Sequence, residues 1–492
     1  MTPGWIPSQP WIDGRETEGQ GARLALKNPS TGEALVEVGT PDAAQVDRAV
    51  RVADAAFDDG RWQSVPVLER QRVLMRAAAA LREHDGELAR LIAEEMGMPE
   101  SAARYVEIPY AAAVFDYYAG LAASITGETL PVDIPAAAPH YLAYTERRPV
   151  GVAALITPFN FPLLLPAWKL APALASGSAA VLKPAPEAPR VALALAVLLE
   201  QAGVPAGVVN VLPGGDAVGE ALVTHPLVRK VSFTGSTISG RRVARLAGDQ
   251  IKRVSLELGG KSPALVFADA DLDNAVSQCL FGLYFNSGQV CQASSRILVQ
   301  DAVYPEFQER FGARAEALRV GDATDPLVDL GPVVQEERLA GIQRLVDQGR
   351  RDGARLVTGG HRLPGAGYFY APTVLTDVPP DSALSQEEVF GPVAALMPFH
   401  DEEEAVRLAN GTRYGLAAAI FTADIRRAFT VSRALKSGTV WINTTQILSP
   451  TAPFGGVKQS GLGRELGRAG LDAFLETRTV LVDLNDSPPT YF

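Results

Sequence analysis

The sequence predicts an α/β protein with two parallel-sheet domains and a small additional β element. The first observation is an alternation of short apolar runs and longer helical segments from residue 150 to 247. A second alternating series extends from about residue 258 to 445. The third observation is length, because a chain of 492 residues exceeds what one hydrophobic core supports. Strands that alternate with helices favour parallel sheets with helices on both faces.

Four helices are expected before the first series. Their signal is apolar residues at helical spacing, and it is clearest after Asp42, which can cap the first of these helices. That helix would bury Val46, Ala49, Val50, Ala53 and Phe57. The expected ranges are 42–57, 66–84, 85–97 and 102–122.

The two series place the strands and helices of the sheets. Buried strands are expected at 150–156, 178–183, 208–212 and 230–234. Helices are expected at 163–175, 188–202, 216–224 and 236–247, the first of them interrupted by its prolines. The second series includes strands at 263–268, 354–360 and 439–443. Two strand-like segments fit neither series and are expected to seek a sheet edge, for which another subunit is one candidate: 141–148 and 477–484.

Composition narrows the class of protein and its location. The formal net charge of −11 argues against a general affinity for nucleic acid or anionic lipid. Two cysteines cannot form a disulfide framework, which favours a reducing compartment. No apolar run is long enough to cross a membrane, and the N-terminal segment lacks the pattern of a secretory signal. We therefore expect a soluble cytoplasmic protein.

The two cysteines lie in contrasting surroundings. Cys279 falls in the apolar helical stretch 275–285 and is expected to be buried and inert. Cys291 lies among small polar residues in "NSGQVCQASSR" (286–296), which predicts an exposed turn. Free backbone N–H groups there could lower the thiol pKa and hold an oxyanion. These local features support a catalytic thiol and a structural one equally, and none of the five histidines lies in a motif that suggests a Cys–His dyad or a metal site.

Three further positions carry weaker signals, each with an ordinary alternative. In "VSFTGSTISG" (231–240), Gly235 permits a tight turn and Ser236 can cap a helix whose N-terminus attracts an anion; a plain strand-to-helix turn is equally consistent. Lys183 ends a strand where α/β sheets bind ligands, or is a solvated surface lysine. Glu257 ends a strand before two glycines and is either a general base or a turn acceptor.

Six motifs in order resemble the NAD(P)-dependent aldehyde dehydrogenase superfamily over nearly the whole chain. They are "TPFNFP" (157–162), "FTGST" (233–237), "ELGGKS" (257–262), "GQVCQASSR" (288–296), "EEVFGP" (387–392) and "PFGGVKQSGLGRE" (453–465). The resemblance implies a Rossmann-like dinucleotide-binding domain of residues 1–125 and 148–257. It also implies an α/β catalytic domain of residues 258–460. Residues 126–147 and 470–492 would form an oligomerisation element of a homodimer or homotetramer.

The resemblance implies a role for four residues in aldehyde oxidation. Cys291 is the expected nucleophile, which forms a thiohemiacetal and then a thioester. The Asn160 side chain and the Cys291 backbone N–H would hold the oxyanion. Glu257 would activate water, and Lys169 would belong to a proton path.

The cofactor implied by the resemblance is NAD, with NADP also accepted. Many NAD-preferring relatives carry a Glu where this chain has Pro186, with Glu187 one step later. Phe159 also stands where a Trp is common in relatives. The matching cofactor-binding residues are Ile156, Thr157, Pro158, Phe159, Lys183, Pro186, Gly214, Gly235, Ser236, Leu258, Glu388 and Phe390.

The substrate pocket implied by the same match is apolar. No Lys or Arg lies in 161–168, 285–292 or 446–454, so an aromatic or medium-chain aliphatic aldehyde is expected. The matching wall residues are Leu165, Trp168, Phe285, Leu448 and Phe454.

The sequence argues against two other classes of function. CoA-acylating relatives generally lack the Glu of the "ELGG" motif, so Glu257 argues against that class. A non-enzymatic structural or cofactor-binding protein on this scaffold would not need Cys291, Asn160 and Glu257 together.

Overall fold

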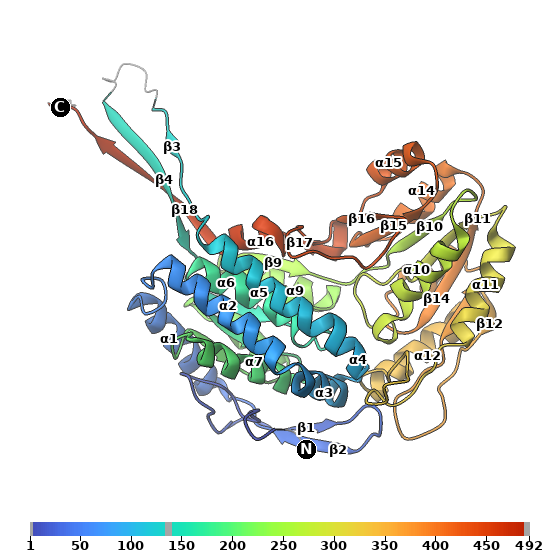
Figure 1. The fold of residues 1–492 in the computed structure, drawn as a ribbon, viewed down its shortest axis with the longest axis horizontal. Coiled ribbons are helices and arrows are strands. Elements are labelled where there is room, and N and C mark those ends of the chain that lie inside the picture. Colours follow the sequence, from blue (N-terminus) through green and yellow to red (C-terminus); the bar gives the residue numbers. More distant parts are fainter. Residues whose placement is uncertain (1–2, 133–139, 487–492) are drawn as a thin grey trace.

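The computed structural model describes residues 3–132 and 140–486 and contains two separate parallel sheets (Figure 1). The six-stranded sheet has the strand order β17-β9-β8-β5-β6-β7. All neighbours are parallel except β17, which is antiparallel to β9. The bounds are β5 (Val152–Ile156), β6 (Ala179–Lys183), β7 (Val209–Val211), β8 (Val228–Thr234), β9 (Arg253–Glu257) and β17 (Gly461–Leu462). The α/β class expected from the alternating pattern is confirmed.

Helices cover both faces of this sheet because successive strand residues point to opposite sides. Ala153 and Leu155 of β5 join one core with α2 (Val67–Glu83), α5 (Ile108–Ala122), α6 (Leu164–Ser176) and α7 (Pro189–Ala202). Val152 and Ala154 join the other core with α1 (Ala43–Asp58), α8 (Asp216–Thr224) and α9 (Thr237–Gly248). Both faces are therefore apolar, as the continuous hydrophobic strands predicted.

Two helices differ from their expected form. The helix expected at 163–175 is not interrupted: α6 passes through Pro166 and Pro172. Pro166 lies in the first turn, where a backbone N–H has no intrahelical acceptor, and complete burial of α6 offsets the bond lost at Pro172. The helix expected at 102–122 is instead three joined pieces: α4 (Glu100–Ala102), a π-helical segment η1 (Ala103–Glu107) and α5. A further helix, α3 (Asp85–Met96), precedes them.

The seven-stranded sheet has the order β12-β13-β14-β11-β10-β15-β16, and only β12 is antiparallel to its neighbour. Its strands are β10 (Pro263–Val266), β11 (Arg296–Gln300), β12 (Arg355–Thr358), β13 (Thr373–Thr376), β14 (Val393–Phe399), β15 (Ala417–Phe421) and β16 (Thr439–Ile442). The associated helices are α10 (Leu272–Tyr284), α11 (Tyr304–Glu316), α12 (Glu336–Arg351), α13 (Ala383–Gln386), α14 (Glu402–Asn410) and α15 (Ile425–Ala434).

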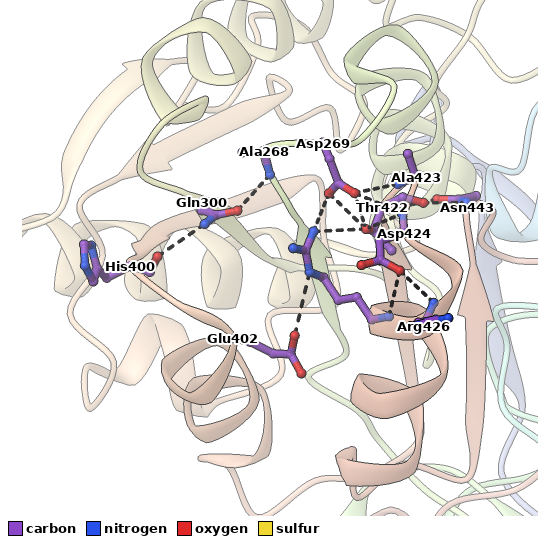
Figure 2. Close-up of polar contacts among 11 residues, drawn as sticks. Ala268, Asp269, Gln300, His400, Glu402, Thr422, Ala423, Asp424, Arg426 and Asn443 are labelled. Carbon is purple, nitrogen blue, oxygen red and sulfur yellow. Dashed lines mark hydrogen bonds and ion pairs between the residues drawn. The ribbon is translucent and has the colours of Figure 1, made fainter.

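A polar cluster around Asp269 joins the carboxyl ends of β10 and β15 (Figure 2). The Asp269 carboxylate accepts hydrogen bonds from Thr422 Oγ1 at 2.8 Å and from the backbone N–H groups of Ala423 and Asp424 at 3.2 and 3.0 Å. Arg427 of α15 donates a further bond at 2.6 Å. One carboxylate thus ties two strands and the start of a helix together.

A separate three-stranded sheet projects from the body of the molecule (Figure 1). Its strands are β3 (Thr129–Leu130), β4 (Tyr141–Pro149) and β18 (Leu475–Asp483). The strand-like segments at 141–148 and 477–484 therefore pair with each other, within one chain. Each segment thus finds a strand to pair with inside the chain, and β18 is an edge strand of this sheet.

A hairpin, two 3₁₀ segments and a short helix complete the described part of the fold. The hairpin of β1 (Leu24–Lys27) and β2 (Ala34–Val38) was not expected from the sequence. The 3₁₀ segments η2 (Phe285–Gly288) and η3 (Lys458–Ser460) and the short helix α16 (Gly467–Asp472) lie in connections. Within the described ranges, no helix combines the length and apolarity that crossing a membrane requires.

Candidate active site

Two adjoining cavities lie at the carboxyl ends of the strands of the six-stranded sheet. The larger, of about 370 Å³, includes Ile156 at the end of β5 and Lys183 at the end of β6. The smaller, of about 70 Å³, contains Asn160, Glu257 and Cys291 in its wall. Both are lined by Pro158, Phe159, Gly235, Ser236 and Arg338, so one continuous wall joins them.

Every residue matched to cofactor binding lies in one of these walls except Gly214. Asp216 and Gly219, which follow it, line the larger cavity instead. Ser236 caps α9 as expected, because its side chain accepts a hydrogen bond from Ser239 N at 3.2 Å. The walls contain Ile156, Thr157, Pro158, Phe159, Lys183, Pro186, Gly235, Ser236, Leu258, Glu388 and Phe390.

Lys183 is buried, so the alternative of a solvated surface lysine is wrong. Its ammonium donates to Pro184 O at 3.1 Å, and burial lowers its pKa to about 8. Pro186 and Glu187 line the same cavity, and burial raises the pKa of Glu187. The charge of Glu187 therefore lies on the wall that also holds Lys183.

The loop before Cys291 has an unusual backbone. Asn286, Ser287 and Gly288 have φ values of 51°, 55° and 72° in succession, a left-handed conformation that costs free energy at non-glycine residues. Two side-chain bonds hold it: Asn286 Nδ2 donates to Asn160 O at 2.9 Å, and Ser287 Oγ donates to Gly331 O at 2.7 Å. Such strain is typical of functional sites.

The expectation of an exposed turn with a lowered thiol pKa is wrong. The segment before Cys291 packs beneath the surface, with Ser287 buried and Gln289 fully buried, and the cysteine itself is half-buried. Burial raises the pKa of the Cys291 thiol, and the charges of Glu388 and Glu257 raise it further. The small residues Ser287 and Gly288 allow this segment to pack closely against the rest of the protein. Cys279 is buried in α10, as expected.

A hydrogen bond to the backbone orients the Asn160 side chain. Its Nδ2 donates one hydrogen bond to Gln289 O at 2.9 Å, and a side-chain amide has two such hydrogens. Gln289 is fixed in turn, because its Oε1 accepts from Val334 N at 3.0 Å. The second Asn160 N–H meets no acceptor among the described residues.

Glu257 is a buried carboxylate whose two oxygens have no hydrogen-bond partner in the described part of the chain. Burial raises its pKa well above the usual range, and the nearby Glu465 raises it further. Lys169 opposes this shift through its charge but pairs directly with Glu465, which also accepts from Ser232 Oγ at 2.9 Å. Lys169 thus forms its ion pair with Glu465, and the charges of both residues affect the pKa of Glu257.

Glu465 was missed by the residue assignments, although it closes the quoted motif 453–465. The sequence feature that could have identified Glu465 is its position as an acidic residue at the end of a glycine-rich run. The structure buries it beside Lys169, a partner nearly three hundred residues earlier in the chain.

The two glycines of the "ELGGKS" motif make room for the site. A Cβ on Gly259 would lie 2.2 Å from Glu388 Oε2, and one on Gly260 would lie 2.4 Å from Cys291 O. Glu388 accepts a hydrogen bond from Gly260 N at 3.1 Å. Burial raises the pKa of Glu388 to about 7, although that bond and the charge of Arg338 oppose the shift.

Arg338 is a second residue that the sequence did not identify. Its guanidinium lies 5.5 Å from the Phe159 ring centroid and 5.7 Å from that of Phe390. It lines both cavities. No motif marks it, because only the tertiary structure brings α12 to the wall.

Among the residues matched to the substrate pocket, Trp168 and Phe454 form one aromatic pair, and Phe285 pairs with Phe161, which was not matched. Trp168 meets Phe454 edge to face at 5.4 Å, and Phe161 stacks on Phe285 at 6.2 Å. Leu165 lines the smaller cavity with Cys291, whereas Phe285 lines a separate cavity of about 480 Å³. Leu448 packs against the cores of both sheets.

Comparisons with known proteins agree with this geometry. The family model described as "Aldehyde dehydrogenase family" matches residues 16–480. An aldehyde dehydrogenase of Enchytraeus buchholzi is 45% identical over 94% of this chain and 93% of that protein. Retinal dehydrogenase 2 of Homo sapiens is 43% identical over 94% of this chain and 89% of that protein.

A solved structure extends the likeness to three dimensions. The NAD⁺ complex of an aldehyde dehydrogenase from Bacillus cereus has a TM-score of 0.94 and 38% identity, and the match covers 97% of this chain and 96% of that one. Since the family model and both relatives span almost the full length, the chain belongs to the aldehyde dehydrogenase family.

Proposed function

We propose that this protein oxidises an apolar aldehyde to a carboxylic acid, with Cys291 as nucleophile and NAD⁺ as electron acceptor. One observation carries the proposal: Cys291, Asn160 and Glu257 line one small cavity that shares a wall with the larger cavity. The CoA-acylating alternative is disfavoured because a buried carboxylate suited to activating water stands in that wall.

The first half of the reaction uses the thiol and two N–H groups that bind the oxygen of the aldehyde. Because the Cys291 pKa is raised, the thiol must lose its proton as it attacks, and Glu257 is the nearby group proposed to take it. The sulfur bonds to the carbonyl carbon and gives a thiohemiacetal. Its oxygen receives the free N–H of Asn160 and the backbone N–H of Cys291. Bound NAD⁺ supplies the two-electron acceptor, and loss of hydride from the former carbonyl carbon leaves a thioester on Cys291.

Glu257 is the proposed base in the second half. It removes a proton from water, whose oxygen attacks the thioester carbon and releases the acid and the Cys291 sulfur. The raised pKa suits this role, because it makes the Glu257 carboxylate a stronger base than an exposed carboxylate. Glu465 and Lys169, joined by an ion pair, are proposed to relay that proton onward.

The larger cavity fits a dinucleotide. It combines the Lys183 ammonium at one strand end with the N-terminus of α9 at Ser236, where an anionic pyrophosphate is favoured. Glu388 and Phe390 line the smaller cavity beside the thiol and are proposed to hold the nicotinamide end. We assign residues 1–125 and 148–257 to cofactor binding and 258–460 to catalysis on this basis. Residues 126–147 and 470–492 are assigned to assembly.

The test is NADH formation with a panel of aldehydes, with and without CoA. Benzaldehyde and hexanal should give higher kcat/KM than succinic semialdehyde, because the residues matched to the substrate pocket include no cation to pair with a buried carboxylate. Arg338, the cation in the wall of the smaller cavity, lies against Phe159 and Phe390 on the proposed cofactor side. Acid should be the product without CoA. A requirement for CoA would establish the acylating class, and the absence of NADH or NADPH with every aldehyde would contradict the proposal.

A further inference from the structure

Glu107 is a fully buried carboxylate outside the residues considered so far. Its Oε1 accepts hydrogen bonds from Leu163 N at 2.8 Å and Leu164 N at 3.2 Å. These two N–H groups stand at the start of α6, which has no side-chain cap of its own. Unpaired N–H groups at a buried helix start are costly, so Glu107 supplies the missing acceptor from 56 residues earlier in the chain.

The π-helical segment η1 places Glu107 there. Pro109 has no N–H, and its ring would collide with the carbonyl of Tyr105 in a regular α-helix. The chain instead widens by one residue, and Ile108 N bonds to Ala103 O, five positions earlier. Tyr105 is exposed on one side of this widened turn, whereas Glu107 is buried on the other. Wide turns of this kind recur at functional sites.

The helix that Glu107 holds is the one that organises the proposed catalytic centre. Asn160 precedes Leu163 by three residues in the same connection, and α6 then carries Leu165 of the cavity wall and Lys169 of the buried ion pair. α5, which continues from η1, packs along α6 (Figure 1). A shift at the start of α6 would therefore move the oxyanion donor relative to Cys291.

We propose that Glu107 is a positioning residue that fixes Asn160 by binding the first N–H groups of α6. This inference rests on the proposed role of Asn160. Burial raises the pKa of Glu107 to about 8, while the Leu163 and Leu164 N–H groups oppose the shift. A neutral carboxyl accepts hydrogen bonds much as an amide does, so Gln is a close substitute at this position.

The first test compares Glu107→Gln with Glu107→Ala. Gln keeps an acceptor oxygen, and its kcat for aldehyde oxidation should stay within about threefold of wild type, since Gln, like the wild-type Glu, leaves an acceptor for the two N–H groups. Ala removes the acceptor and should lower kcat by about tenfold to hundredfold, because sub-ångström misplacement of a catalytic group is costly. The KM for NAD⁺ should change less than twofold (about the scatter expected of a remote site). Rates are taken per titrated Cys291 thiol, at temperatures where both variants are folded.

A double-mutant cycle with Asn160→Ala separates positioning from general damage. If Glu107 acts through Asn160, adding Glu107→Ala to Asn160→Ala should lower kcat by less than about twofold. An equal loss in both backgrounds, or a Glu107→Ala variant with only a reduced melting temperature, would overturn the inference. So would an Asn160→Ala variant with wild-type kcat.

A measurement without turnover distinguishes this inference from the proposed function. Hydrogen exchange of peptides covering residues 157–166 should be faster in Glu107→Ala and unchanged in Glu107→Gln. Glu100→Ala is the matched control. It removes a carboxylate from α4, which is joined to η1, but this carboxylate pairs with Arg90 and not with α6. The control should leave exchange and kcat unchanged. Faster exchange in Glu107→Ala, together with a wild type that oxidises no aldehyde, would retain the anchor and reject the proposed function. Unchanged exchange in Glu107→Ala would reject the anchor.

Discussion

At the scale of single residues, the chemistry depends on groups whose protonation the fold has shifted. Burial raises the pKa of Cys291 and Glu257, and it lowers that of the Lys183 ammonium to about 8. Each group is thereby kept closer to its neutral form than it would be in water. Clusters of this kind are typical of sites where protons must move.

The two cysteines should differ in their importance. Cys291→Ser should abolish aldehyde oxidation, because the serine hydroxyl is a far weaker nucleophile. Cys279→Ala should retain nearly full kcat and lose only stability, about 1 kcal/mol or somewhat more, since it vacates a small buried volume in α10. Steady-state NADH formation and thermal unfolding measure the two effects. Equal loss of activity in both folded variants would remove Cys291 from the role of nucleophile.

Glu257→Gln should separate the two halves of the reaction. Without Glu257 the thiol must lose its proton to solvent, which slows its attack, but water is a much weaker acid than a thiol and depends more on the base. NADH should therefore appear in a first turnover that is faster than the following ones. Removal of a general base typically costs about 10²- to 10⁴-fold in the step that it serves. Stopped-flow absorbance resolves the two phases. Wild-type steady-state turnover would show that Glu257 is not the base.

Cofactor choice should respond to Pro186→Glu. Pro186 offers neither an acceptor for a ribose hydroxyl nor a charge to repel a 2′-phosphate, so we expect wild type to use NAD⁺ and also NADP⁺. Its preference should be smaller than the roughly thousandfold that two ionic contacts of about 2 kcal/mol each could give. The substitution should lower kcat/KM for NADP⁺ much more than for NAD⁺. An unchanged ratio would shift the selectivity to Glu187, which lines the same cavity.

At the scale of elements, single polar side chains hold the strand ends together. Asp269 is the clearest case, because it binds two backbone N–H groups, a hydroxyl and a guanidinium from the end of β15 and the start of α15 (Figure 2). Burial alone would raise its pKa, but the bonds from Thr422, Asp424 and Arg427 outweigh burial and lower it.

Asp269→Asn should destabilise the protein in a pH-dependent way. Loss of charge-assisted hydrogen bonds should lower the free energy of unfolding by about 1 to 2 kcal/mol at neutral pH, a modest value because the side chain is about one third exposed. A carboxylate with a lowered folded-state pKa contributes stability above its unfolded pKa, and that contribution disappears as pH falls through the folded value. Urea unfolding from pH 7 to pH 3 measures the difference between the variants, which should shrink towards the acid end.

A matched control is Asp273→Asn, which removes the highly exposed partner of Arg310. Surface ion pairs contribute little, so its effect should be under about 1 kcal/mol. An equal loss in the two variants would show that the cluster around Asp269 has no special part in joining β10 to β15.

At the scale of the whole molecule, the projecting sheet is the feature most suited to assembly. β18 pairs with β4 along nine residues but leaves its outer edge open, and its exposed face includes Leu481. Open strand edges tend to be covered or paired. We therefore expect a homodimer or homotetramer in solution.

Deleting residues 477–492 should disrupt that assembly. Most of β18 would be lost, and β4 would lose its partner, so the molar mass by light scattering should fall or the protein should aggregate. Deleting only 487–492, beyond the described residues, leaves β18 whole and should preserve the wild-type mass. A wild-type protein that is monomeric by light scattering would contradict the expected homodimer or homotetramer.

Much of the fold could be predicted from the sequence, and three residues predicted to be catalytic line one cavity of the structure. Periodicity located the strands from β5 to β8 and most of the helices from α1 to α9, because those segments bury their apolar residues at a regular spacing. The motifs in order predicted Cys291, Asn160 and Glu257 through their resemblance to a known family, because each of the three lies within a short stretch of sequence.

Only the tertiary structure decided what surrounds those residues. It buried the loop of Cys291 and raised its pKa, it paired Lys169 with Glu465, and it brought Arg338 and Glu107 to the site from other helices. It also joined β4 to β18 within one chain. The physical reason is common to all of these: burial and charge pairing depend on residues distant in sequence, which local spacing does not encode.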